Sequence, residues 1–143
     1  MRKGVAFLAR IAVVLLSGGL SRAKSERRRR VPADDTQEHL NVDGTDRTYF
    51  LLIPESLAEG KPGPLVLVFH GGGGHAATMP NFTHFDGLAD REGFLVAYPE
   101  SVNKHWNDTR GLSPADDVAF IGILIAELER SRGVDPKRIY ATG

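Results

Sequence analysis

The feature that most constrains the fold is a short apolar run that leads directly into a glycine-rich turn. Residues 65–69 contain no polar side chain, and His70 and the four glycines 71–74 follow them at once. A strand that is apolar at every position is typical of a parallel sheet covered on both faces. Consecutive glycines admit unusual backbone angles and leave main-chain N–H groups free to face an anion or a developing oxyanion. The sequence therefore predicts a layered α/β domain with a functional turn at one end of its sheet.

The flanking segments alternate between strand and helix, as such a domain requires. Asp43-Gly44 is a two-residue hairpin signal between two β-prone segments. We expect strands at residues 39–42, 47–53, 65–69, 94–98 and 138–142. The first helix is expected to carry Phe82, Phe85, Leu88 and Ala89 on one face. A second helix at 114–132 is apolar nearly all round its middle and should be well buried, with Asp116 and Asp117 capping its first turn.

Charge and cysteine content exclude several function classes. The first 30 residues hold nine basic residues and one acid, a net charge of +8, which leaves −8 for residues 31–143 because the whole chain is neutral. An acidic folded part is a poor candidate for nucleic-acid binding, so no such partner is expected. The absence of cysteine excludes disulfides and zinc–cysteine sites, and the histidines lack paired metal-ligand spacing. We expect neither a metal nor another cofactor.

The N-terminus resembles an export signal. Basic residues precede an apolar stretch, and Ser21-Arg22-Ala23 offers small residues for a signal peptidase. We expect a signal peptide at 1–23, a charged linker at 24–37 and a folded domain at 38–143, in a secreted or periplasmic protein. A transit peptide is the alternative, since arginines recur and acids are absent before Glu26. A stable membrane span is not expected, because the longest uncharged run has 11 residues and a bilayer needs roughly 20.

Two chemistries suit the glycine turn. Gly71-x-Gly73-x-x-Ala76 fits a loose dinucleotide fingerprint, with Glu100 placed as a ribose-binding acid, but Pro80 and Pro99 interrupt the pattern. The other chemistry is the oxyanion loop of an α/β-hydrolase, and a plain tight turn is a third reading. Gly143 follows the strand expected at 138–142, at the position where such a hydrolase has the first glycine of its G-x-S-x-G nucleophile elbow. This order of motifs favours the oxyanion loop.

Residues 47–143 resemble a known family of enzymes. The matching motifs lie at residues 65–73, at 88–90 together with 93–99, and at 106–107, 116–121 and 135–143. Together they are similar to the polyhydroxybutyrate depolymerase and feruloyl esterase group of secreted α/β-hydrolases. The resemblance implies the N-terminal portion of an α/β-hydrolase fold, with a mostly parallel sheet and helices on both faces, truncated before the nucleophile elbow.

The resemblance also implies a reaction. A serine would attack a carboxylic ester of a polymer, either a polyhydroxyalkanoate or a feruloylated or acetylated polysaccharide. The serine, acid and histidine of the triad would all lie beyond Gly143, so the chain should be inactive as given, and His70 would shape its turn. Gly71 and Gly72 are the candidate oxyanion donors, and Trp106 lines the substrate cleft or acts as a packing anchor. The alternative function is a noncatalytic or nucleotide-binding module that uses the turn at 71–74.

Overall fold

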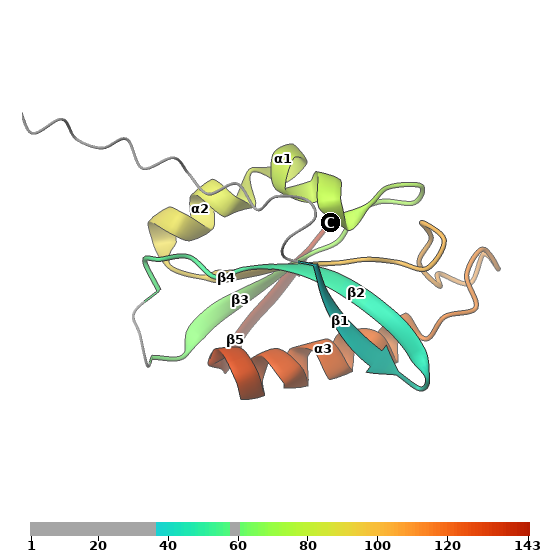
Figure 1. Cartoon of the computed structure of the whole chain (residues 1–143). Coiled ribbons are helices and arrows are strands. Elements are labelled where there is room, and N and C mark those ends of the chain that lie inside the picture. The colour runs from blue at the N-terminus through green and yellow to red at the C-terminus, as the bar shows by residue number, and fades with distance from the viewer. Residues whose placement is uncertain (1–36, 58–60) are drawn as a thin grey trace, which may run out of the picture.

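The structure is a computed structural model that describes residues 37–57 and 61–143. The expected signal peptide at 1–23 and residues 24–36 of the expected linker lie outside the described residues. The described part folds into one five-stranded sheet with helices on both faces (Figure 1). Within it, no helix has the length and apolar character needed to cross a membrane.

The fold opens with the predicted hairpin. β1 (Gln37–Val42) and β2 (Thr45–Leu52) pair in antiparallel register, with Val42 opposite Thr45. The two turn residues, Asp43 and Gly44, have φ values of 48° and 82°. A two-residue turn with positive φ at both positions matches the twist of the flanking strands, which is why Asp-Gly and Asn-Gly pairs form such hairpins. The hairpin prediction is confirmed.

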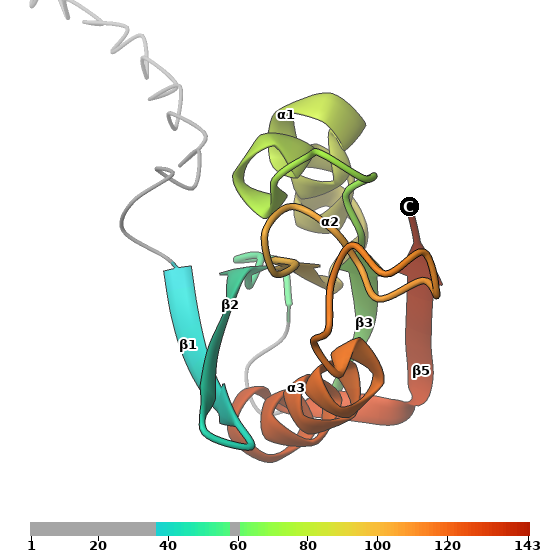
Figure 2. The ribbon, with the colours of Figure 1, turned by 90° about the vertical axis from the view of Figure 1, so that its right-hand side faces the viewer.

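The remaining strands set up the functional edge of the sheet. β3 (Gly63–Val68), β4 (Leu95–Pro99) and β5 (Val134–Thr142) join the hairpin in the order β1-β2-β4-β3-β5. Figure 2 shows the hairpin at one side of the sheet and β5 at the other. β3 runs parallel to β4 and β5, whereas β2 runs antiparallel to β4. The sheet is therefore mixed, with its parallel part centred on β3. The carboxyl ends of β3, β4 and β5 share one edge, where α/β proteins form their binding sites.

Three short helices cover one face of the sheet, but they are not the continuous helix expected. They are η1 (Ala76–Thr78), α1 (Met79–Thr83) and α2 (Phe85–Glu92). His84 has a φ of 58°, and this left-handed residue ends α1 before α2 begins. Phe82 is 80% exposed whereas Ala89 is fully buried, so the expected common face from Phe82 to Ala89 is wrong. The left-handed His84 thus divides the expected helix into two.

The opposite face is covered by α3 (Asp117–Arg132) (Figure 1). The Asp116 side chain caps it by accepting the Ala119 N–H at 2.8 Å, as predicted. Its buried stripe consists of residues four apart, namely Phe120, Leu124 and Leu128. Val118 is 85% exposed and Ile123 is 38% exposed. The expected burial all round the helix is therefore wrong, because only one stripe of α3 contacts the sheet within the described part of the chain.

The core lies on both sides of the sheet because β3 and β4 alternate their side chains between the two faces. Leu65 and Leu67 pack with the buried stripe of α3, and Val68 packs with Ala89 on the side of α2. The expected fifth strand begins earlier than predicted, at Val134. Its pairing with β3 shifts register between Val134 and Ile139, so Asp135-Pro136 forms an irregularity inside β5.

Candidate functional site

The glycine turn lies at the carboxyl end of β3, beside the end of β5. The Phe69 N–H donates to the Thr142 carbonyl at 2.8 Å, which holds the two strand ends together. The Gly74 N–H then donates to the Gly71 carbonyl at 3.0 Å and closes a β-turn, in which the third residue, Gly73, has a φ of 78°. A positive φ at this turn position favours glycine. The Gly73 N–H donates to the Lys104 carbonyl at 2.8 Å and ties the turn to the loop after β4.

The two glycines singled out from the sequence keep their N–H groups free. Within residues 37–57 and 61–143, the N–H groups of Gly71 and Gly72 have no hydrogen-bond acceptor, and both residues are exposed. A Cβ atom built on Gly71 would meet nothing within 4 Å, and one built on Gly72 would meet only His105 Nδ1, at 3.7 Å. Two adjacent backbone donors at the edge of the sheet are therefore unpaired within the described residues.

His70 lies under the turn and is 3% exposed. Its Nδ1 is 2.8 Å from the Gly71 carbonyl, and because a carbonyl can only accept, Nδ1 carries the hydrogen. Its Nε2 lies 2.9 Å from Glu100 Oε1 and 3.3 Å from the Ser101 nitrogen. The Ser101 hydroxyl is buried and makes no hydrogen bond in the described part of the chain, so Ser101 and His70 do not form a nucleophile–base pair.

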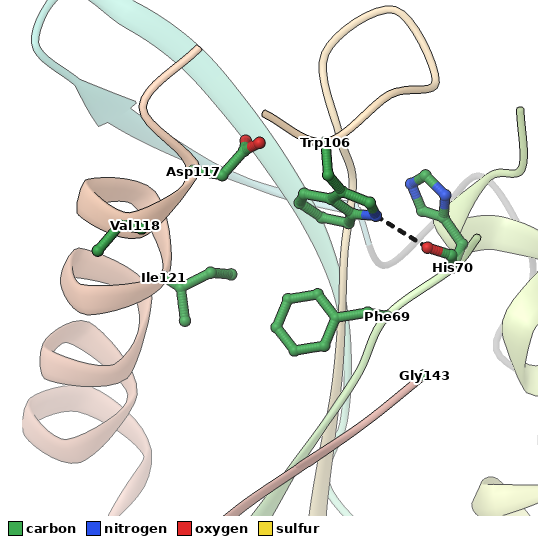
Figure 3. A pocket seen from close by; sticks show the side chains of 7 residues that line it. All are labelled: Phe69, His70, Trp106, Asp117, Val118, Ile121 and Gly143. Atoms are coloured by element: carbon green, nitrogen blue, oxygen red, sulfur yellow. Dashed lines mark hydrogen bonds between the residues drawn. The ribbon is translucent and has the colours of Figure 1, made fainter. Parts of the chain in front are cut away.

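An open apolar cleft adjoins the turn (Figure 3). Its volume is about 500 Å³, and it is lined by Phe69, His70, Trp106, Asp117, Val118, Ile121 and Gly143. Trp106 forms one wall: its Nε1–H donates to the His70 carbonyl at 2.8 Å, and its ring meets the Phe69 ring edge-on at 5.3 Å between centroids. Trp106 thus has the contacts of a packing anchor while its ring faces the cleft.

The sequence analysis missed a buried ion pair behind this cleft. Arg47 of β2 is 3% exposed, and its Nη2 donates to Asp117 Oδ1 at 2.7 Å and to the Glu100 carbonyl at 3.2 Å. The guanidinium also lies 4.0 Å above the Phe120 ring. The second Asp117 oxygen accepts the Asn107 N–H at 2.6 Å. This pair connects the hairpin, the start of α3 and the loop that carries Trp106.

A sequence signal for the ion pair existed. Arg47 shares the period-two inward face of β2 with Tyr49 and Leu51, and a charged residue in such a buried pattern needs a partner. The first-turn acids of α3 were both assigned to capping. The structure separates them, because Asp116 caps the helix and Asp117 neutralises Arg47.

Two carboxyl groups outside the cleft have displaced pKa values. Burial raises the pKa of the Asp86 carboxyl in α2 and also the pKa of the Tyr98 hydroxyl. The Tyr98 hydroxyl donates a hydrogen bond to the Asp86 carboxyl at 2.5 Å. Hydrogen bonds from Arg110 hold the pKa of the exposed Asp108 carboxyl below its usual range. Among the residues that the structure describes, no cluster of three histidine or carboxylate side chains could hold a metal ion.

The geometry weighs against dinucleotide binding. The Glu100 carboxylate does not face outward as a ribose-binding acid would, because it accepts the Ala76 N–H at 2.9 Å and contacts His70. The helix that follows the turn, η1, has three residues and α1 has five. A dinucleotide site places its pyrophosphate at the N-terminus of a longer helix that packs against the strand.

Solved structures define the class of protein to which this fold belongs. S-formylglutathione hydrolase from Staphylococcus aureus aligns with a TM-score of 0.56 at 16% identity, covering 74% of this chain and 46% of that one. A bacterial heroin esterase aligns with a TM-score of 0.54 at 26% identity, covering 80% of this chain and 37% of that one. The expected fold is confirmed: the chain has a partial α/β-hydrolase fold.

Relatives found by sequence similarity indicate which α/β-hydrolases the chain resembles. A protein named as an esterase, NocK of Nocardia uniformis subsp. tsuyamanensis, is 35% identical over 127 residues, which cover 82% of this chain and 36% of the relative. Feruloyl esterase C of Emericella nidulans is 30% identical over 103 residues, which cover 68% of this chain and 36% of the relative. No protein-family model matches the chain.

The chain thus spans about a third of the length of these two relatives. Its resemblance to the feruloyl esterase group of α/β-hydrolases is confirmed. The resemblance to polyhydroxybutyrate depolymerases stays a prediction.

Proposed function

We propose that this chain supplies the oxyanion loop and one wall of the substrate cleft of a carboxylic ester hydrolase. Gly71 and Gly72 are the oxyanion donors, and Trp106 contacts the substrate. The observation that carries the proposal is the pair of adjacent backbone N–H groups without an acceptor in the described structure, next to His70 in the wall of an apolar cleft. The esterase names of the relatives support the reaction class.

The proposed chemistry depends on the negative charge that develops on the ester carbonyl oxygen. A serine hydroxyl that attacks an ester carbonyl loses its proton to a histidine, and the carbonyl oxygen becomes an oxyanion that preorganised N–H donors stabilise. Residues 1–143 contain no G-x-S-x-G sequence. In the proposed enzyme, the serine, acid and histidine come from chain beyond Gly143. The hydrogen bond between Phe69 and Thr142 supports this arrangement, because the chain would continue from β5 beside the glycine turn.

The proposed substrate is an ester carried by a polymer. Two relatives are named feruloyl esterase C and bifunctional acetylxylan esterase/xylanase, which favours a feruloylated or acetylated polysaccharide. A polyhydroxyalkanoate, which the sequence also suggests, would need the same attack on an ester carbonyl. We also propose that residues 1–23 direct export, followed by a linker at 24–37 and a folded domain at 38–143.

The test compares two polypeptides. The 143-residue chain and a longer product, continued through the coding sequence that follows codon 143, are assayed with p-nitrophenyl acetate, methyl ferulate and polyhydroxybutyrate film. We expect hydrolysis by the longer product and none by the 143-residue chain, since the nucleophile is missing. The control replaces the elbow serine of the longer product with alanine. Saturable turnover by the 143-residue chain would contradict the proposal, as would a folded longer product that hydrolyses none of the esters.

A further inference from the structure

The neighbours of the His70 side chain, which is buried under the glycine turn, hold it in one orientation. His70 is held from three sides: Nδ1 bonds to the Gly71 carbonyl, Nε2 lies against the Glu100 carboxylate, and the His70 carbonyl accepts the Trp106 Nε1–H. The Trp106 ring lies 5.0 Å from the His70 ring, between centroids, at an interplanar angle of 34°. The imidazole side chain is 1% exposed, so it has little freedom to rotate.

The hydrogen bond from His70 fixes the plane of one peptide group. The Gly71 carbonyl accepts from His70 Nδ1 at 2.8 Å and from the Gly74 N–H at 3.0 Å, so it points into the turn. No peptide bond in the described part of the chain is cis. In a planar trans peptide, the N–H of the next residue points opposite to the carbonyl. The Gly72 N–H therefore points away from His70 and from the inside of the turn.

Glu100 anchors this arrangement to the sheet. It follows Pro99, the last residue of β4, and its own N–H donates to the Thr48 carbonyl of β2 at 2.9 Å. One carboxylate oxygen lies 2.9 Å from His70 Nε2, and the other accepts the Ala76 N–H at 2.9 Å. Glu100 therefore links the two ends of the glycine turn, His70 before it and Ala76 after it, to rigid strands.

We infer that His70 and Glu100 are a positioning pair that sets the direction of the Gly72 N–H. The inference rests on the proposed function, in which this N–H is an oxyanion donor. Glycine at four successive positions gives the backbone no conformational preference of its own. A turn made of such residues needs an external constraint to hold one donor direction, and oxyanion stabilisation depends on donors that are already oriented before charge develops.

The test uses two substitutions that each keep one half of the imidazole. In His70→Asn, the side-chain amide can occupy the place of Nδ1 and still donate to the Gly71 carbonyl. In His70→Gln, the amide can occupy the place of Nε2 and contact Glu100, but nothing replaces the Nδ1 donor. The readout is the residual dipolar coupling of the Gly72 N–H in the weakly aligned, ¹⁵N-labelled 143-residue chain, with the sheet amides as the orientation reference.

We expect the Gly72 N–H coupling measured in wild type and in His70→Asn to agree with the N–H direction in the structure. The coupling measured in His70→Gln should differ from that value. Equal couplings in both folded variants would overturn the inference. A measurement on wild type keeps the inference falsifiable if the variants do not fold, because ¹⁵N shifts of the His70 ring must show a protonated Nδ1. An unprotonated Nδ1 would overturn it. These readouts need no catalysis, so their failure is distinct from the absence of esterase activity.

Discussion

Removing Asp117 tests whether the cleft depends on its buried ion pair. Asp117→Ala would leave the Arg47 guanidinium, 3% exposed, without its carboxylate and leave the Asn107 N–H without its acceptor. Breaking a buried pair by deleting one partner destabilises proteins by about 3 to 5 kcal/mol. This is a large fraction of a typical unfolding free energy of roughly 5 to 15 kcal/mol. With a urea m-value of about 2 kcal/mol per molar, the unfolding midpoint should fall by roughly 2 M.

The assay is urea unfolding followed by the fluorescence of Trp106, the single tryptophan of the sequence, and by circular dichroism. The matched control is Asp116→Ala, one residue earlier, which removes only the helix cap and should cost about 1 kcal/mol. Because Asp117 binds the backbone next to Trp106, its loss should also change the native emission spectrum, whereas the control should not. An Asp117→Ala variant that is destabilised no more than the control would refute this account of the cleft.

Two further predictions concern stability away from the cleft. Burial raises the pKa of the folded-state Asp86 carboxyl, so its stabilising contribution is present below its unfolded pKa of about 3.8 and is lost as pH rises through the raised folded value. Asp86→Asn keeps an acceptor for the Tyr98 hydroxyl and should gain stability relative to wild type as pH rises from 3 to 7, in thermal melts at each pH; a constant difference would contradict this. Gly122 lies inside α3, and a Cβ atom built on it would meet no neighbour within 4 Å, so Gly122→Ala should add about 0.8 to 1.0 kcal/mol by helix propensity, and a lower melting temperature would contradict that.

Much of the fold follows from local sequence patterns. The Asp43-Gly44 pair specifies its hairpin because few other residues adopt positive φ at both turn positions. The apolar strand before the glycine turn is apolar because helices cover both of its faces. The helix expected to end at residue 132 does so, because Gly133 follows with a φ of 66°.

The errors arose where long-range packing decides the outcome. The apolar spacing from Phe82 to Ala89 is helical, but this spacing does not predict that His84 adopts a left-handed conformation and separates α1 from α2. Val118 is apolar and 85% exposed, because the number of faces that a helix buries depends on its neighbours and not on its own composition.

The candidate site could be predicted only in part, because contacts between residues far apart in the sequence complete it. The glycine turn is contiguous in sequence and could be found as a motif. Its supporting contacts are not contiguous: Glu100 lies 30 residues after His70, and Asp117 lies 70 residues after Arg47. Sequence periodicity reports which face a residue occupies, but it does not report which distant side chain completes its hydrogen bonds.

The measurement that most directly tests the central claim is the kcat of the longer product with proline at position 72. Gly72 is the second residue of its β-turn, a position that accepts proline, so Gly72→Pro should remove the N–H and leave the turn intact. Gly72→Ala is the control, because it adds a side chain into open space and keeps the N–H. We predict that the proline variant loses about 10²- to 10³-fold in kcat, with little change in KM, while the alanine variant stays near wild type. A folded proline variant with the kcat of the alanine variant would contradict the assignment of Gly72 as an oxyanion donor.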